Sequence, residues 1–402
     1  LTDLFPWQQP GCMYNRTWPI APHPDLLAKR WERLLETEDA EERQRCFVPG
    51  ASGRDIYTAV AGYKRLVAEP PTAAHQPIVP YGYRSFDTQW TFDDPRLAKT
   101  DSPSLWESRS DEQIFLVTTS TQAVTAGPAA TLFTAVPDKH AYNGRGGKDV
   151  FPLYRDAFST PNCSHDLLRA MSTLMSSASI TVEDLFAYCY GILAGSDYTA
   201  RFRLELETPG SRIPLTRSSS LFQRMAQHGR VLASLNTQGT RFSSDFVPPD
   251  EYQPKWQREP KRPPANARDF SYEESSGTLL VGDGLLGGVP TNVWEFSVSG
   301  MQVLRKWLGY RTVTGAGRAA SSTSPLDQIR PTEWYSEWSQ ELVDLVATLA
   351  ANLELMRKGS AILEEILEAP LITASELPEP PDSSRKAPSS RRVPRDTRET
   401  LL

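Results

Sequence analysis

The sequence has few cysteines, few lysines and no long apolar run. The four cysteines show no paired CxxC spacing, so we expect neither a disulfide framework nor a zinc site, and such thiols suit a reducing cytoplasm. No window approaches 18 consecutive apolar residues, so no membrane-spanning helix is predicted. The chain opens on Leu1 without the charged and apolar regions of a signal peptide. We expect it to be the later part of a longer polypeptide.

Familiar catalytic motifs are missing as well. Residues 282–287 match G-x-G-x-x-G, but Gly288 and Pro290 follow them, so the helix that would hold a pyrophosphate cannot begin there. This pattern predicts a hairpin turn instead. The five histidines stand alone in the sequence, and no G-x-S-x-G pattern occurs. We therefore predict no catalytic residue and no metal site.

One nuclease-like pattern stays open as an alternative. Asp250, Glu259 and Lys261 resemble a PD…ExK site, in which carboxylates on adjacent strands converge on Mg²⁺. Pro260 lies between the last two residues and disfavours the strand that the site needs. This alternative predicts Mg²⁺-dependent cleavage that is lost in Glu259→Ala.

Charge is segregated along the chain. The net charge of −6 argues against a uniformly basic nucleic-acid binder, but a binding surface depends on how charge is distributed. No Asp or Glu occurs in residues 208–244 or in residues 296–326. These two acid-free stretches contain nine positive charges: Arg212, Arg217, Arg224, Arg230, Arg241, Arg305, Lys306, Arg311 and Arg318.

Such stretches are typical of a groove for a polyanion, with cations on phosphates and polar side chains on base edges. From Lys139–Lys148, a loop with charges, an Asn and glycines, we predict groove contacts by Asn143, Arg145 and Lys148. Three alternatives stay open: Ser/Thr/Gly-rich loops with scattered arginines, a plain hairpin end at 139–148, or basic stretches that face an acidic neighbouring domain. The residues predicted to contact phosphates or guanines are Arg217, Arg224, Arg305, Lys306, Arg311 and Arg318.

The hydrophobic pattern predicts an α+β fold. Helical spacing predicts helices over 25–36, 166–176, 181–194, 339–356 and 361–368, the third with a capping box of Thr181 and Asp184. Alternating or β-branched runs predict strands over 78–90, 114–119 and 131–136, and a hairpin of 278–281 with 293–298. The many prolines of 246–268 are incompatible with any regular element.

Several segments together resemble one family. Tyr83–Trp90 is similar to the Y-R-P-F-D-x-R-x element that follows the catalytic core of many fused adenine methyltransferases, with Ser85 and Gln89 in place of the usual proline and arginine. Further segments resemble that family's helix, its PRIPL-type strand and its late G-x-x-V-L-x-x-W-L element: Asp184–Leu193 with Tyr198, Arg212–Leu215, and Ser299–Leu308 with Arg311. Residues from about 4 to 371 resemble the C-terminal specificity region of type ISP restriction–modification enzymes, which join nuclease, translocase, methyltransferase and target-recognition parts.

The resemblance implies a mixed-sheet target-recognition region. Residues 1–77 would connect it to an upstream methyltransferase-like part, 78–245 and 271–372 would form its two parts, and 246–270 would be a proline-rich linker. The second part would carry the C-terminal helices, and 373–402 would be a disordered tail.

The implied function is sequence-specific recognition of double-stranded DNA in a cytoplasmic enzyme, without catalysis by this chain. The implied partners are DNA, a methyltransferase part that binds S-adenosylmethionine, and translocase or nuclease parts. Tyr83, Phe86 and Trp307 would be structural or interdomain residues. A second hypothesis is a protein-interaction module that docks a partner subunit through an exposed apolar stripe on helix 339–356.

Overall fold

The computed structural model describes residues 1–48, 53–119, 122–124, 126–142, 148–176, 179–242, 248 and 252–389. It combines helices with antiparallel sheets, which confirms the α+β prediction. The helices are α1 (Pro24–Glu36), α2 (Ala40–Phe47), α3 (Pro103–Glu107), α4 (His165–Leu174), α5 (Val182–Leu193), α6 (Ser196–Arg201), α7 (Ser219–Asn236), α8 (Thr291–Trp294), α9 (Val303–Tyr310), α10 (Ser336–Glu368) and α11 (Asp382–Arg385). Short 3₁₀ turns are η1 (Leu66–Ala68), η2 (Glu205–Glu207), η4 (Gly317–Ala319), η5 (Pro325–Gln328) and η6 (Ala374–Glu376).

Among the described residues, the strands form two four-stranded sheets and three smaller ones. Their orders are β1-β7-β5-β6, β10-β11-β12-β9, β2-β4-β3, β13-β14 and β15-β8. Their bounds are β1 (Gln9–Pro10), β2 (Ile20–Ala21), β3 (Ile78–Arg84), β4 (Asp87–Phe92), β5 (Phe115–Thr119), β6 (Thr131–Phe133), β7 (Lys148–Pro152), β8 (Leu215–Thr216), β9 (Lys255–Arg258), β10 (Phe270–Glu273), β11 (Thr278–Val281), β12 (Gly284–Gly287), β13 (Ser297–Val298), β14 (Met301–Gln302) and β15 (Leu371–Ile372).

The sheet β1-β7-β5-β6 lies between two hydrophobic cores. Because side chains alternate along a strand, Phe115 and Val117 pack into the first core, whereas Ile114 and Leu116 pack into the second. The strand predicted at 114–119 is therefore buried on both faces. Its pairing with β6 confirms the first half of the strand predicted at 131–136.

The first core gathers α1, α9 and the β3–β4 hairpin. The predicted helix 25–36 is confirmed as α1, whose Leu26, Trp31 and Leu34 are buried in this core. The single strand expected at 78–90 is two antiparallel strands, because the chain turns at Phe86, whose φ is +62°. Side chains from residues 7–66 pack into the same core, so the stretch expected to be a connector is built into the fold.

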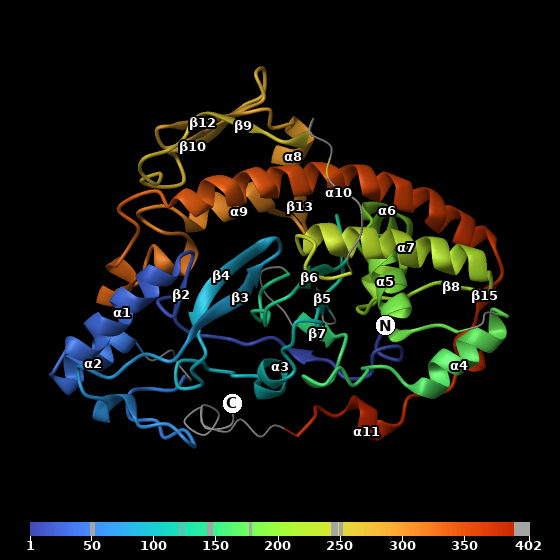
Figure 1. Ribbon diagram of the computed structural model, residues 1–402, viewed down its shortest axis with the longest axis horizontal. Coiled ribbons are helices and arrows are strands. Elements are labelled where there is room, and N and C mark those ends of the chain that lie inside the picture. Colours follow the sequence, from blue (N-terminus) through green and yellow to red (C-terminus); the bar gives the residue numbers. More distant parts are fainter. Residues whose placement is uncertain are drawn as a thin grey trace.

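The second core is helical and contains α4, α5 and α7 (Figure 1). The predicted capping box of α5 is confirmed, since the Asp184 N–H donates to Thr181 Oγ1 at 3.1 Å and the Asp184 carboxylate accepts from Thr181. Helix α7 was not predicted. It crosses α5 at two glycines, Gly191 and Gly229, where the backbones approach too closely for a side chain.

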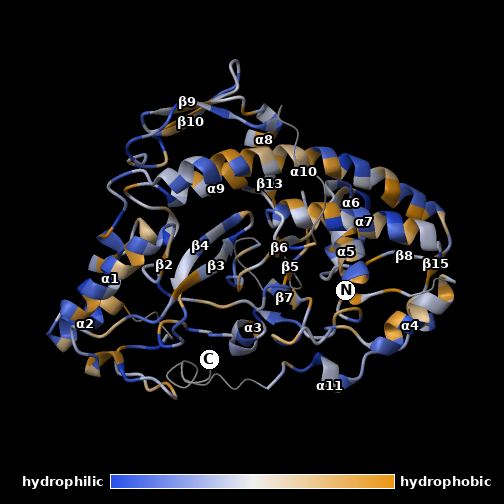
Figure 2. Ribbon diagram, viewed as in Figure 1, coloured by the Kyte–Doolittle hydropathy of each residue, from blue (hydrophilic) through white to orange (hydrophobic). Residues whose placement is uncertain are grey.

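Helix α10 joins the two cores. It runs unbroken over 33 residues, where the sequence predicted two helices. Its first half places Leu342 and Leu349 in the first core, and its second half places Leu355 and Ile366 in the second. Apolar and polar residues alternate in bands along it in Figure 2.

The sheet β10-β11-β12-β9 lies on the outer side of α10 (Figure 1) and corrects two expectations. Strand β11 pairs with β12 through a turn at Gly282, which confirms the hairpin turn but not the predicted partner 293–298, whose first residues form α8. Strand β9 lies within the proline-rich stretch and pairs with β12. The four residues of β9, which lie between Pro254 and Pro260, suffice for an edge strand, so the prediction of a wholly irregular stretch was wrong.

The chain after α10 returns to the body of the molecule. Residue 371 begins a strand that pairs with β8, and α11 follows. Arg385 forms an ion pair with Asp3 at 2.8 Å, and Arg155 donates to the carbonyl of Ser384 at 2.6 Å. Residues 373–389 are therefore packed in this structure, contrary to the prediction of a disordered tail that begins at 373. The remainder of that tail lies outside the described residues.

A buried histidine between α7 and α10 predicts acid sensitivity. His228 Nε2 is buried without a hydrogen-bond partner in the described part of the chain, beside Gly359. Burial, with a smaller contribution from the Lys358 charge, lowers the pKa of His228 to about 4. The unfolded chain takes up this proton near pH 6.5, so stability is complete above pH 6.5 and is lost as the pH falls toward 4.

We expect the free energy of unfolding to fall by about 2 kcal/mol through this group between pH 7.5 and pH 5. Denaturant titrations at both pH values measure the fall. A His228→Gln variant should lose this part of the pH dependence, and an identical pH dependence in both proteins would contradict the prediction.

Candidate nucleic-acid interface

The predicted groove-contacting loop can be located only through its flanks. Asn143 and Arg145 lie outside the described residues, as does the side chain of Lys148, whose backbone begins β7. Before the loop, Arg84 pairs with Asp138 at 2.9 Å, and the Ser85 N–H donates to the carbonyl of residue 141 at 2.8 Å. The described residues that begin this loop, 139–142, therefore lie beside the β3–β4 turn.

The arginines of the first acid-free stretch bind other parts of the chain. Arg224 donates twice to Glu365 of α10, at 2.6 and 2.8 Å, and Arg217 pairs with Glu376. Arg230 pairs with Asp184 at 2.8 Å. The remaining two, Arg212 and Arg241, donate to backbone carbonyls. Distant carboxylates thus pair with three of the five arginines of this stretch, which contains no acidic residue of its own.

Arg311, in the second stretch, is buried. Its guanidinium pairs with Asp87 at 3.0 Å and with Glu341 at 3.3 Å, and its Cζ lies 3.6 Å from the centroid of the Trp307 ring. Only 1% of the Arg311 side chain and 2% of the Asp87 side chain are exposed. The structure therefore gives Arg311 a role in joining α9, α10 and the β3–β4 hairpin, in place of the predicted contact on a DNA-facing surface.

The other predicted cations of this stretch are exposed. Arg305 and Lys306 lie on α9, and Arg318 lies on η4. Arg305 Nε donates to Gln302 at 3.0 Å, and the Arg305 guanidinium lies 5.1 Å from the centroid of the Trp294 ring. Within the described ranges, none of the three forms an ion pair with a carboxylate. They are available to an external anion.

A group of cations in the proline-rich stretch was missed. Residues 255–268 contain five cations and one carboxylate, Glu259. The five are exposed in the structure: Lys255, Arg258, Lys261, Arg262 and Arg268. The sequence carries this signal, as four more positive than negative charges in 14 residues, although the prolines of the stretch favour a linker.

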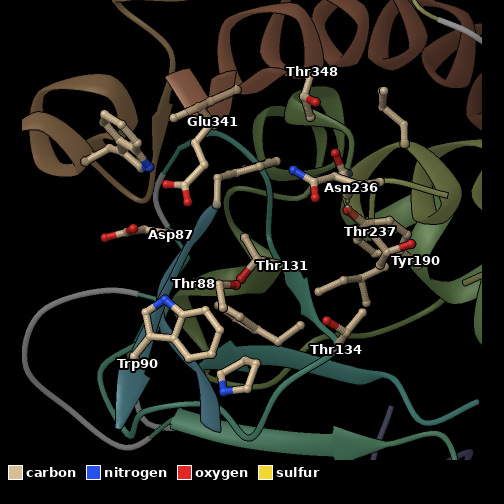
Figure 3. Close-up of a pocket in the computed structure, with 18 of the residues that line it drawn as sticks. Asp87, Thr88, Trp90, Thr131, Thr134, Tyr190, Asn236, Thr237, Glu341 and Thr348 are labelled. Atoms are coloured by element: carbon tan, nitrogen blue, oxygen red, sulfur yellow. Dashed lines mark hydrogen bonds between the residues drawn. The ribbon is translucent and has the colours of Figure 1, made fainter. Parts of the chain in front are cut away.

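A cavity of about 260 Å³ lies where the two cores meet under α10 (Figure 3). Asp87, Arg311 and Glu341 line one end, and Asn236 and Thr237 from the end of α7 line the other. Burial raises the pKa of Glu341, although the Arg311 charge opposes this shift. With two carboxylates and one guanidinium, the cavity is not a site for a phosphate.

The nuclease alternative gains no support from the geometry. Glu259 and Lys261 are exposed, and Asp250 lies outside the described residues. No group of three or more His, Cys, Asp or Glu side chains that could hold a metal occurs among the residues searched, which are the described ones. The same part of the chain contains no helix long and apolar enough to cross a membrane.

Residues 3–345 match the family model described as the type ISP C-terminal specificity domain. The chain belongs to this family. No curated protein matches the sequence significantly.

Three solved structures share the fold. They are described as a DrdV–DNA complex, a nuclease-deletion mutant of the type ISP restriction–modification enzyme LlaGI in complex with a DNA substrate mimic, and the ATP-dependent type ISP enzyme LlaBIII bound to DNA. Their identities are 18, 16 and 12%, with TM-scores of 0.62, 0.57 and 0.57. The match covers 92, 88 and 92% of this specificity domain but 36, 28 and 24% of those chains. At these identities the likeness establishes the fold alone.

The segments that carried the resemblance meet in space. Asp87 from the first segment accepts from Arg311, which follows the last one, and from Gln89 at 2.9 Å. Gln89 thus supplies a donor to this carboxylate where the family's arginine is replaced. Tyr188 and Tyr198 donate to the carbonyls of Pro214 and Arg212 at 2.6 and 2.7 Å, which ties the helix to the PRIPL-type strand. These segments are the structural framework of the domain.

Proposed function

We propose that this specificity domain recognises a particular site on duplex DNA within a restriction–modification enzyme. The observation that carries the proposal is the contrast between the two acid-free stretches. The arginines of the first stretch bind carboxylates or carbonyls of the chain itself. In contrast, Arg305, Lys306 and Arg318 of the second stretch are exposed and form no ion pair within the described part. Exposed arginines and lysines suit phosphate oxygens and guanine edges. The DNA complexes of the three similar structures support the same partner.

Methyl transfer would belong to another part of the longer enzyme. The chain spans about a third or less of the similar structures, two of which are named as type ISP restriction–modification enzymes. We propose that the specificity domain presents an adenine to a methyltransferase part that binds S-adenosylmethionine. Translocase or nuclease parts would act on the DNA that it selects.

The hypothesis that helix 339–356 docks a partner subunit requires an exposed apolar stripe on this helix. Among the apolar residues of 339–356, Leu342, Leu345, Val346, Leu349 and Met356 are buried within the chain itself. The exposed apolar stripe which that hypothesis predicts is not found on this helix.

The purified 402-residue chain and a randomised duplex pool test the proposal. We expect enrichment of one asymmetric site, with affinity that falls steeply as salt rises. Retention without any preferred site, or no retention at low salt, would contradict it.

An Arg305→Ala/Lys306→Ala variant should weaken this binding. Two lost phosphate contacts would reduce the slope of log affinity against log salt by about 1.8 for every sequence alike, whereas a lost base contact would relax one position of the site and reduce affinity by about 1–3 kcal/mol. Competition binding over a salt series distinguishes the two results. Arg169→Ala, at an exposed residue paired with Asp166 on α4, is the control and should leave binding unchanged.

A further inference from the structure

The surface between the β9 strand and η4 is cationic, and the sequence-based prediction included only one of its residues, Arg318. We define the loop surface as Arg258, Lys261, Arg262 and Arg268 together with Arg318, all exposed. In the part of the chain that the structure describes, none of these five side chains forms an ion pair. Charges left unpaired in this way keep their full attraction for an external anion.

The backbone of the loop is firmly held. Asp283 Oδ1 accepts the Lys261 N–H at 3.0 Å, and this bond is the main cause that holds the pKa of Asp283 below its usual value, with the Arg258 charge adding to it. Gly282, at a φ of +57°, lies against the carbonyl of Arg262. Pro263 and Pro264 are buried. The cations therefore extend from a fixed backbone, which lowers the entropy lost on binding.

The loop surface continues the cations of α9. The Val313 and Thr314 N–H groups, which follow α9, donate to the carbonyls of Pro264 and Ala265 at 2.9 and 3.0 Å. The chain then leads directly into η4 and Arg318. The proline-rich loop and the segment after α9 are thus joined side by side, and their cations belong to one region.

The carboxylates of this region are few and partly engaged. Asp269 and Asp283 accept backbone N–H groups of the loop itself, from Ala265 at 2.9 Å and from Lys261. Glu259 and Glu333 are exposed. Glu259 lies between Arg258 and Lys261 in the sequence, so its negative charge repels an anion that approaches these two cations.

We propose that the loop surface, beside the α9 cations, binds the phosphate backbone of duplex DNA. The four arginines of the loop surface present planar forks that match phosphate oxygens, and the surface adjoins α9, the helix proposed to contact DNA. The inference rests on the proposed function for its partner. It adds a second contact region that contributes affinity and salt dependence without sequence preference.

Two triple variants with equal charge test the proposal in the full chain. The loop variant is Arg258→Gln/Lys261→Gln/Arg262→Gln. The control variant is Arg33→Gln/Arg45→Gln/Arg65→Gln, at exposed positions on or beside α1, α2 and η1 without an ion pair in the described ranges. The loop variant should bind every duplex at least about tenfold more weakly at low salt, with a salt slope smaller by up to about 2.7 and an unchanged ratio between preferred and random sites. The control should bind like the unmodified chain.

Glu259→Gln provides an independent variant of opposite sign. Removing this charge should tighten binding to all duplexes about two- to threefold at low salt, an effect that salt screens. Equal affinities of the loop and control variants, or a lost site preference with an unchanged salt slope, would overturn the proposal. Binding of the unmodified chain without a preferred site would refute site recognition alone, and weakening in the loop variant would still support this surface. No binding to any duplex would overturn both.

Discussion

Replacing Arg311 with alanine is expected to lower the free energy of unfolding by about 3–5 kcal/mol, because it leaves the Asp87 carboxylate buried without its cation. The Asp87 side chain is 2% exposed, and within the described residues its other side-chain donor is the amide of Gln89 at 2.9 Å. The substitution also removes the guanidinium that lies 3.6 Å from the Trp307 ring centroid. Denaturant titration followed by tryptophan fluorescence measures the change.

The matched control is Arg305→Ala on the same helix, because Arg305 is exposed and lacks an ion pair in the described part of the chain. It should change stability by less than about 0.5 kcal/mol, yet it should weaken DNA binding. Arg311→Ala should lower stability strongly, whereas the molecules that remain folded should bind DNA as the unmodified chain does. If Arg311→Ala left stability within 1 kcal/mol of the unmodified chain and abolished DNA binding, its placement as a structural residue would be wrong.

The different environments of Arg305 and Arg311 show where a prediction of surface charge from the sequence fails. Arg305 and Arg311 are six residues apart in one acid-free stretch. The buried carboxylate that pairs with Arg311 belongs to Asp87, which is 224 positions away in the chain. Glu365 and Glu376 are similarly remote from Arg224 and Arg217. A stretch without acids predicts uncompensated charge only if the fold brings no distant carboxylate to it.

Elements with strong local signals were predicted well. Helix α1 has apolar residues at helical spacing, and α5 has both members of its capping box within four residues. The turn at Gly282 needs a positive φ that glycine adopts readily, so its motif indicated a hairpin correctly. In each case the stabilising contacts lie within a few positions of one another.

Elements fixed by tertiary contacts were missed. Helix α7 contains Gly229 near its middle, and glycine in a helix interior lowers helix propensity by about 1 kcal/mol relative to alanine. Strand β9 has only four residues between prolines and is defined by its pairing with β12. The path of residues 373–389 depends on Arg385 and Arg155, which contact sites far along the chain. Such contacts cannot be inferred from the pattern of one sequence.

Substituting Gly229 with alanine is expected to destabilise the chain by about 3 kcal/mol or more, although alanine is the better helix former. A Cβ atom at this position would lie 1.8 Å from the carbonyl oxygen of Ala187 and 3.0 Å from the amide nitrogen of Gly191. Both neighbours are backbone atoms of α5, so the two helices must separate, and the second core loses its packing. The free energy of unfolding, taken from denaturant titration, measures this loss.

Gly309→Ala separates the steric effect from helix propensity. Gly309 lies within α9, where an added Cβ would meet only the Cβ of Ala316 at 3.7 Å, an ordinary contact. Its variant should be as stable as the unmodified chain or more stable by up to about 1 kcal/mol, because alanine restricts the unfolded chain and favours the helix. A Gly229→Ala protein as stable as Gly309→Ala would show that α5 and α7 do not cross at the separation seen here. A large loss of stability in Gly229→Ala but not in Gly309→Ala would establish that this close crossing stabilises the second core. The hydrophobic pattern of the sequence does not predict such a crossing.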